Sequence, residues 1–153
     1  METLERIIAE HPFLAGFDRG FTHLMVSCAS NVRFGAGEYI FREGDPADTF
    51  YLLREGMVAV EVPAPQHQPI VVATLGVGEI LGWSWILPPF QWKHQARAVS
   101  DVRAIALDGK CLRTKCEENH DLGFEVVKRF ARIIEERLET TRLQLLDVYG
   151  ARR

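Results

Sequence analysis

The sequence predicts an α+β fold in which an antiparallel β-roll, a jelly-roll-like double-stranded barrel, is flanked by N-terminal helices and followed by a long C-terminal helix. Three observations predict it: apolar residues at helical spacing before residue 30, short β-rich segments over about 30–107, and an apolar repeat over 119–149. With 153 residues the chain is about the size of one domain. We therefore expect residues 1–153 to form a single domain.

Short amphipathic helices are expected in the N-terminal part of the chain. Apolar residues recur there at three- to four-residue spacing, with an interruption at Pro12. The residues that follow this spacing are Leu4, Ile7, Ile8, Phe21, Leu24, Met25 and Cys28. The helical periodicity ends at Asn31, which marks the expected boundary between helices and strands.

The middle of the chain has the composition of short strands. Segments rich in β-branched and aromatic residues alternate in part between apolar and polar side chains. They are NVRF, YIF, FYLLREG, MVAVEV, IVVATL and ARAVSDVRAIAL. Glycines fall between them, as expected of tight turns. Short strands at this regular spacing favour an antiparallel roll over alternating strands and helices.

Beyond the strands the spacing of apolar residues becomes helical again. Asp108 is placed to cap a short helix that runs through Glu118. Asn119 and Asp121 are both candidates to cap a much longer helix, which is expected to end near Tyr149.

The long helix carries two apolar stripes. One is a heptad seam, with alternating spacings of four and three residues, formed by Val127, Ala131, Ile134, Leu138, Thr141, Leu145 and Val148. The other is expected to face the strands and consists of Leu122, Val126, Phe130 and Ile133. We expect the seam to be a homodimer interface with the same helix of a second copy. The alternative is a helix that packs only on its own domain.

Composition and charge bound the class of protein. Hydrophobic residues make up 47% and charged residues 25%, and no window reaches the roughly 20 apolar residues of a membrane-spanning helix. Met1 leads into the mixed-charge run ETLERIIAE rather than into a signal peptide, so a cytoplasmic protein without membrane association is expected. With a net charge of −3, the protein as a whole has no excess of positive charge with which to bind nucleic acid.

The cysteines and histidines form no recognisable reactive or metal-binding pattern. Three cysteines, an odd number without a CxxC motif, favour reduced thiols over a disulfide framework. Cys111, Cys116 and His120 come nearest to a metal site, but the five-residue spacing places the two thiols on different faces of a helix, so no metal is expected. The five histidines are scattered, and neither a nucleophile motif nor a pair of catalytic carboxylates is present, which predicts a protein that is not an enzyme.

Four stretches of the sequence are similar to those of a known family. They are Phe41–Asp45 (FREGD), Phe50–Gly56 (FYLLREG), Leu75–Glu79 (LGVGE) and the segment ARAVSDVRAIAL. Together they resemble the cyclic nucleotide-binding domain of the catabolite-activator (Crp/Fnr-like) and protein-kinase regulatory families, over roughly residues 10–150. The stretch Leu146–Gly150 resembles the hinge that precedes the DNA-binding domain of the activators, and three residues follow it. The resemblance implies a sensor without a DNA-binding domain and without direct sequence-specific DNA contact.

The resemblance also implies a ligand site. In this family a segment beginning with Gly-Glu forms a short helix whose amino end meets a cyclic phosphate, and unpaired amides and the helix dipole favour an anion there. The matching residues are Gly78, Glu79, Ile80, Leu81 and Gly82. The carboxylate of Glu79 is expected to accept a hydrogen bond from a ribose hydroxyl.

Trp92 occupies the position of the family's phosphate-binding arginine, and Lys93 follows it. A guanidinium pairs with two phosphate oxygens, whereas an indole offers one N–H donor. Lys93 and His94 are the candidate replacements. Near the middle of the long helix, Glu136 and Arg137 fall where the activators touch the base from across the dimer. The candidate ligand is thus a cyclic nucleotide or another small anion, bound at a site with an altered phosphate end.

Trp83, Trp85 and Trp92 allow two interpretations. They form an aromatic wall on which a flat ligand stacks, or they fill the space of the nucleotide and turn the pocket into core. The first interpretation gives a dimeric, non-enzymatic sensor that signals to an effector protein. The second gives a ligand-free pocket that serves as a dimerising protein-interaction module. The sequence leaves both open.

Overall fold

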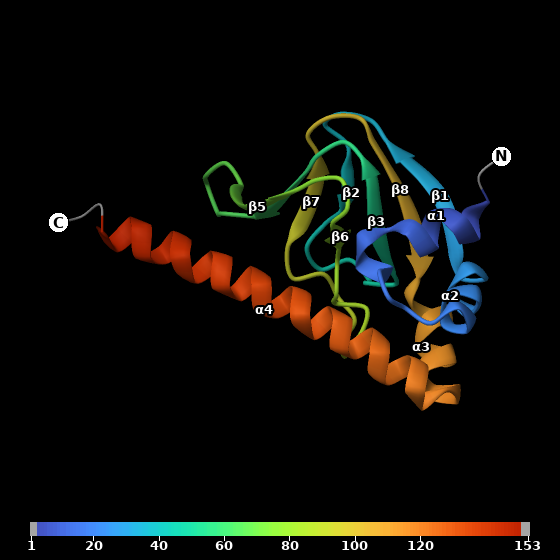
Figure 1. Ribbon diagram of the computed structural model, residues 1–153. Coiled ribbons are helices and arrows are strands. Elements are labelled where there is room, and N and C mark those ends of the chain that lie inside the picture. The colour runs from blue at the N-terminus through green and yellow to red at the C-terminus, as the bar shows by residue number, and fades with distance from the viewer. Residues whose placement is uncertain (1–2, 151–153) are drawn as a thin grey trace.

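The computed structural model describes residues 3–150 and confirms the predicted roll with flanking helices (Figure 1). The helical segments before the roll are α1 (Leu4–Glu10), η1 (Pro12–Leu14) and α2 (Arg19–Val26). The strands are β1 (Ala29–Phe34), β2 (Tyr39–Phe41), β3 (Thr49–Glu55), β4 (Val58–Val62), β5 (Ile70–Leu75), β6 (Ile80–Leu81), β7 (Gln95–Ala98) and β8 (Val102–Asp108). The helices after the roll are α3 (Gly109–Glu118) and α4 (His120–Gly150).

The strands form two antiparallel sheets that face each other. One has the order β1-β8-β3-β6 and the other the order β2-β7-β4-β5. Neighbours in each sheet are mostly distant in sequence, as in the pairing of β1 with β8. This non-local pairing brings the first and last strands of the roll together, while within residues 3–150 the two sheets stay separate and the barrel is not closed.

Two apolar cores lie on opposite sides of the β1-β8-β3-β6 sheet, because successive side chains of a strand point to opposite faces. In β6, for example, Ile80 belongs to one core and Leu81 to the other. The interior core lies between the sheets and is formed by Phe41, Ala47, Leu53, Val58, Val60, Leu75, Leu81, Trp92, Ala96, Ala98, Val102 and Ala104. The outer core lies between this sheet and the helices and includes Ile8, Met25, Phe50, Leu52, Trp85, Ile105, Leu112, Leu122, Val126 and Phe130.

Both C-terminal helices begin where the sequence predicts. The Asp108 carboxylate accepts a hydrogen bond from the Cys111 amide at 3.0 Å and caps α3. The Asn119 side chain accepts from the Leu122 amide at 3.2 Å, so Asn119 rather than Asp121 caps α4.

The inner stripe of α4 packs on the outer core, as predicted. Leu122, Val126 and Phe130 are buried and Ile133 is half-buried. The C-terminal part of α4 extends past the roll (Figure 1), and every residue from 138 to 150 is exposed. None of the helices in residues 3–150 combines the length and apolarity needed to cross a membrane.

The residues of the heptad seam lie on the exposed side of α4. Val127, Leu138 and Leu145 are each more than half exposed, and Ile134 is 38% exposed. The seam therefore does not pack on its own roll. If α4 packed only on its own domain, which was the alternative, these apolar side chains would stay in water. The homodimer remains a prediction.

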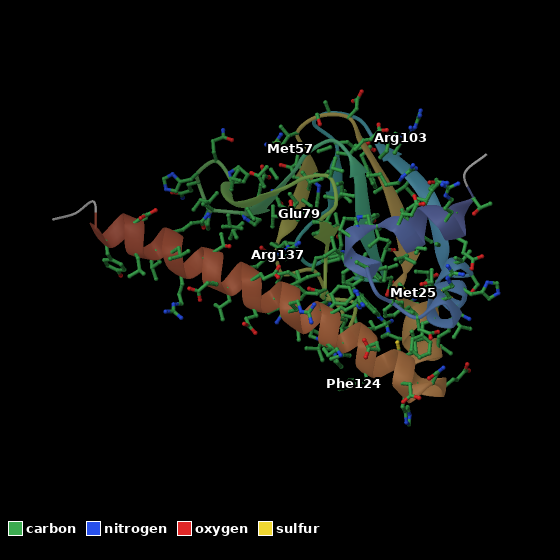
Figure 2. The ribbon with its side chains drawn as sticks, in the orientation of Figure 1. Met25, Met57, Glu79, Arg103, Phe124 and Arg137 are labelled. Carbon is green, nitrogen blue, oxygen red and sulfur yellow. A yellow bond between two sulfur atoms is a disulfide. The ribbon has the colours of Figure 1, made fainter. Side chains whose placement is uncertain are left out.

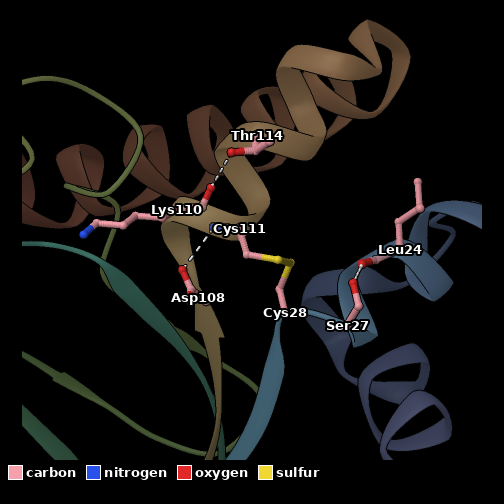
Figure 3. Close-up of a disulfide and its surroundings, with 7 residues drawn as sticks. All are labelled: Leu24, Ser27, Cys28, Asp108, Lys110, Cys111 and Thr114. Carbon is pink, nitrogen blue, oxygen red and sulfur yellow. Dashed lines mark hydrogen bonds between the residues drawn. A yellow bond between two sulfur atoms is a disulfide. The ribbon is translucent and has the colours of Figure 1, made fainter.

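The cysteines differ from the prediction of reduced thiols. Cys28 and Cys111 form a disulfide with their Cα atoms 5.7 Å apart (Figure 3). Cys116 is free. The two cysteines meet because of the register of β1 on β8. Ala29 lies opposite Leu107, and this places Cys28, just before β1, beside Cys111 in the first turn of α3. These cysteines are 83 residues apart, and spacing along the chain gives no signal for such a pair. The cysteine count thus no longer argues for a reducing compartment.

Candidate functional site

The Gly78–Glu79 segment does not begin a helix, in contrast to the expectation from the resemblance. It forms a turn that leads directly into β6, and no helix occurs from residue 76 to residue 108. Its amides are already paired, since Gly78 donates to the Leu53 carbonyl at 3.1 Å and Glu79 donates to the Gly76 carbonyl at 3.1 Å. The Glu79 carboxylate accepts from the Gly76 amide at 2.7 Å. The predicted anion site of free helix-start amides is therefore absent from this turn.

The turn becomes a strand because both following residues are buried on opposite sides. Ile80 enters the outer core and Leu81 the interior core, and β6 pairs with Tyr51 and Leu52 of β3. Only an extended backbone places consecutive side chains on two faces of a sheet.

Trp92 lies inside the roll and is 4% exposed. Its indole stacks on the Phe41 ring, with centroids 3.7 Å apart and planes 7° from parallel. The edge of the indole's six-membered ring lies against Gly82, where a Cβ atom would lie 2.8 Å from Cζ3 of Trp92 and closer still to Cη2. Gly82 has φ +98°, a left-handed conformation that favours glycine. Phe41, Trp92 and Gly82 thus form a packed stack within the interior core.

The three tryptophans do not form a common aromatic wall. Trp85 belongs to the outer core, where it is 1% exposed and stacks on Phe50 at 4.7 Å. Trp83 is half-buried beside α4, with the Arg137 guanidinium 5.0 Å above its ring. Of the three, only Trp92 enters the interior of the roll.

The cationic groups near Trp92 point elsewhere. The Arg97 Nε donates to the Glu61 carboxylate at 3.0 Å, and the Lys93 side chain is exposed. Arg97 faces away from Trp92 because its neighbours Ala96 and Ala98 face the interior core.

Glu61 is the centre of a polar network that the sequence analysis missed. It is 4% exposed and accepts hydrogen bonds from Gln95 at 3.1 Å, Tyr39 at 3.3 Å and Arg97. Burial acts to raise the pKa of Glu61, but these hydrogen bonds and the charge of Arg97 outweigh it and the pKa lies below its ordinary value. A lone carboxylate within the apolar run MVAVEV was the signal available in the sequence.

His94 lies half-buried against aromatic rings. Its ring centroid is 5.9 Å from that of Phe41 and 6.3 Å from that of Trp83. Burial lowers the pKa of His94, and the positive charge of Arg137 lowers it further. An imidazole with a lowered pKa is a weak replacement for the arginine that the resemblance implies at this site.

Arg137 connects the middle of α4 to the roll. Its Nη2 donates to the Ile80 carbonyl, and Glu79 and Glu136 lie close enough for their charges to act on it. Burial lowers the pKa of Arg137, and the two carboxylates act in the opposite direction. Figure 2 shows Arg137 and Glu79 on the facing sides of α4 and the roll.

A pocket of about 460 Å³ lies beside this connection, between α4, η1 and the turn before β6. It brings together five of the ten predicted ligand residues: Gly78, Glu79, Ile80, Glu136 and Arg137. The other five do not line it, namely Leu81, Gly82, Trp92, Lys93 and His94. The predicted site is therefore divided, since half of it lines an open pocket on the helix side, Leu81 and Trp92 are packed in the interior core, and Lys93 is exposed.

Comparisons with known proteins identify the fold's relatives. The family model for the cyclic nucleotide-binding domain matches residues 31–119. A CRP-like cAMP-activated global transcriptional regulator of Mycobacterium tuberculosis is 23% identical over 145 residues, which are 95% of this chain and 63% of that protein. This chain thus spans less than two thirds of the length of that relative.

Solved structures are also similar to this chain. A putative cyclic nucleotide-binding protein from Geobacter metallireducens GS-15 superposes with a TM-score of 0.79 at 28% identity, covering 90% of this chain and 99% of that one. A cyclic nucleotide-binding domain from Methylobacillus flagellatus KT superposes with a TM-score of 0.81 at 19% identity, covering 94% and 83% of the two chains. The second likeness shows the fold alone.

Proposed function

Because the chain belongs to the cyclic nucleotide-binding domain family, we propose that it is a non-enzymatic regulatory module with an altered nucleotide site, which dimerises through α4 and signals to a partner protein. The position of Trp92 is the observation that carries the proposal. A cyclic nucleotide in the roll requires space and a positively charged group for its phosphate. Trp92 occupies space next to Gly82 and offers no charge.

The surrounding side chains do not replace the arginine. Arg97 is paired with Glu61, Lys93 is exposed, and burial lowers the pKa of His94. A charged hydrogen bond contributes about 1.5–3 kcal/mol, so the loss of a bidentate pair weakens binding by roughly two or more powers of ten. We therefore expect ordinary cyclic AMP binding in the roll to be lost.

Isothermal titration of the protein with cyclic AMP and cyclic GMP tests the proposal. Neither nucleotide is expected to bind with a sub-micromolar dissociation constant. Sub-micromolar binding of either nucleotide to the unmodified chain would refute the altered site.

The stacked interior also supports a second candidate function, the ligand-free interaction module. A roll packed by Phe41 and Trp92 holds its shape without a nucleotide. The two candidates differ in one measurement. Recovery of the same partner protein with and without added small molecules favours the ligand-free module, and recovery that requires a small molecule favours the sensor.

A further inference from the structure

The pocket beside α4 lies outside the roll. Its lining comes from η1, the turn before β6 and one face of α4, and none of the interior-core residues lines it. Its volume of about 460 Å³ falls in the range of small-molecule sites, roughly 300–1,000 Å³. A ligand there would therefore contact the helix without entering the space occupied by Trp92.

The pocket has an excess of one positive charge. Arg129, Arg132 and Arg137 line it together with Glu79 and Glu136. Three positive and two negative groups leave one positive charge, which matches a monoanion better than a phosphate of charge about −1.5 to −2.

The three arginines differ in how they are engaged. The Arg129 Nη1 donates to the Phe13 carbonyl at 2.7 Å, and Arg137 donates to the Ile80 carbonyl, so both are anchored to the pocket wall. The Nε of Arg129 is buried and finds no acceptor among the described residues. Arg132 is exposed, and no hydrogen bond or ion pair holds it within residues 3–150. Its planar donor fork is free to pair with a carboxylate through two parallel hydrogen bonds.

The remaining wall is apolar. Pro12, Phe13, Ile80 and Ile133 line the pocket beside the charged groups. From these observations we infer that the pocket binds a small amphipathic monocarboxylate, with the carboxylate on Arg132 and the apolar body against Phe13 and Ile133.

The position of the pocket leaves the predicted dimer seam free. Arg129, Arg132 and Glu136 each precede a seam residue by two positions, Ala131, Ile134 and Leu138 respectively. Residues two apart do not share a face of a helix. A ligand would thus act on α4 from the side opposite to a second copy, and the inference stands whether or not a nucleotide binds in the roll.

The test is isothermal titration of the full chain with sodium benzoate and sodium hexanoate, with inorganic phosphate as an anion that has no apolar body. At least one of the two carboxylates is expected to bind with a dissociation constant of about 1 mM or below, and phosphate more weakly. Arg132→Gln should weaken carboxylate binding at least about tenfold through loss of a charged hydrogen bond. Arg132→Lys should weaken it less, since the charge remains.

Arg142→Gln is the matched control, because Arg142 is an exposed arginine of α4 that pairs with Glu139 outside the pocket. It should bind the carboxylates as the unmodified chain does. The inference is overturned if neither carboxylate binds, if Arg132→Gln binds them unchanged, or if phosphate binds as tightly as they do. A parallel titration with cyclic AMP separates this inference from the proposed function. If cyclic AMP binds tightly to both the unmodified chain and Arg132→Gln, the proposal of an altered site in the roll is wrong, and the inference about the α4 pocket is unaffected.

Discussion

At the scale of the residue, the contact between Trp92 and Gly82 determines the interior of the roll. The indole of Trp92 occupies the space that a side chain at position 82 would need. Its stacking on Phe41 fixes its orientation, and aromatic pairs of this kind contribute about 0.5–1.5 kcal/mol beyond area burial. The glycine that follows β6 thus makes room for the indole inside the roll.

Gly82→Ala is expected to lower the free energy of unfolding by about 2–4 kcal/mol, because it combines backbone strain at φ +98° with overpacking against Trp92. Urea denaturation measures the loss. Gly37→Ala is the matched control, since Gly37 has φ +88° but an added Cβ atom would meet no other atom within 4 Å, and the change should cost only about 1 kcal/mol. Equal losses in the two variants would contradict the contact with Trp92.

Glu61 makes a pH-dependent contribution to stability. Because its folded-state pKa lies below the ordinary value of 4.5, its contribution is present above about pH 4.5 and is lost as the pH falls through the lowered pKa. Glu61→Gln is expected to lower the free energy of unfolding by about 1–3 kcal/mol at pH 7, and the difference from the unmodified chain should shrink at about pH 3.

Urea denaturation at both pH values provides the measurement for Glu61. Glu55→Gln is the control, because Glu55 pairs with Arg103 at 3.5 Å on the surface, where an ion pair contributes little. A loss in Glu61→Gln that is the same at both pH values would show that the carboxylate acts through packing and not through its charge.

At the scale of the element, α4 has two apolar surfaces, of which only one is covered by the rest of the described fold. Its inner stripe is covered by the outer core, which stabilises the fold. Its seam is exposed over several turns, and the exposed leucines and valines are the basis of the predicted homodimer.

Leu138→Asp is expected to prevent dimerisation, because it places a charge in the centre of the seam. Sedimentation equilibrium should then give the mass of one chain in place of two. Leu143→Asp is the matched control, since Leu143 is also an exposed leucine of α4 but lies off the seam, and it should leave the dimer intact. A single-chain mass for the unmodified protein at high concentration would rule the seam out as a homodimer interface.

At the scale of the whole molecule, the ends of the roll are joined covalently as well as by hydrogen bonds. The disulfide links the residue before β1 to the first turn of α3 and closes a loop of 83 residues. Loops of this length gain stability from a cross-link mainly through restriction of the unfolded chain.

Reduction of the disulfide, or the double change Cys28→Ser and Cys111→Ser, is expected to lower the free energy of unfolding by about 2–4 kcal/mol. Denaturation with and without reductant measures the effect. Cys116→Ser should respond to reductant as the unmodified chain does, because Cys116 is free. Equal stability with and without reductant would contradict the cross-link.

Local patterns in the sequence determined the elements of this protein. Apolar spacing identified the helices, alternation identified the strands other than β6, Asp108 was recognised as a cap, and Asn119 was one of two candidate caps, because each of these signals depends on residues within a few positions. The resemblance to the family was also carried by short motifs, and it correctly implied the fold.

Only the tertiary structure decided how distant residues meet. Strand register paired Cys28 with Cys111 and turned Arg97 towards Glu61. The segment between β6 and β7 placed Trp92 against Gly82, and burial on two faces made Ile80 and Leu81 a strand in place of a helix start. These outcomes depend on which strands pair and in which register. A one-residue shift of a strand would turn each of its side chains to the other face of the sheet. Local sequence specifies what each segment becomes, and the pairing of distant strands specifies which side chains share a site.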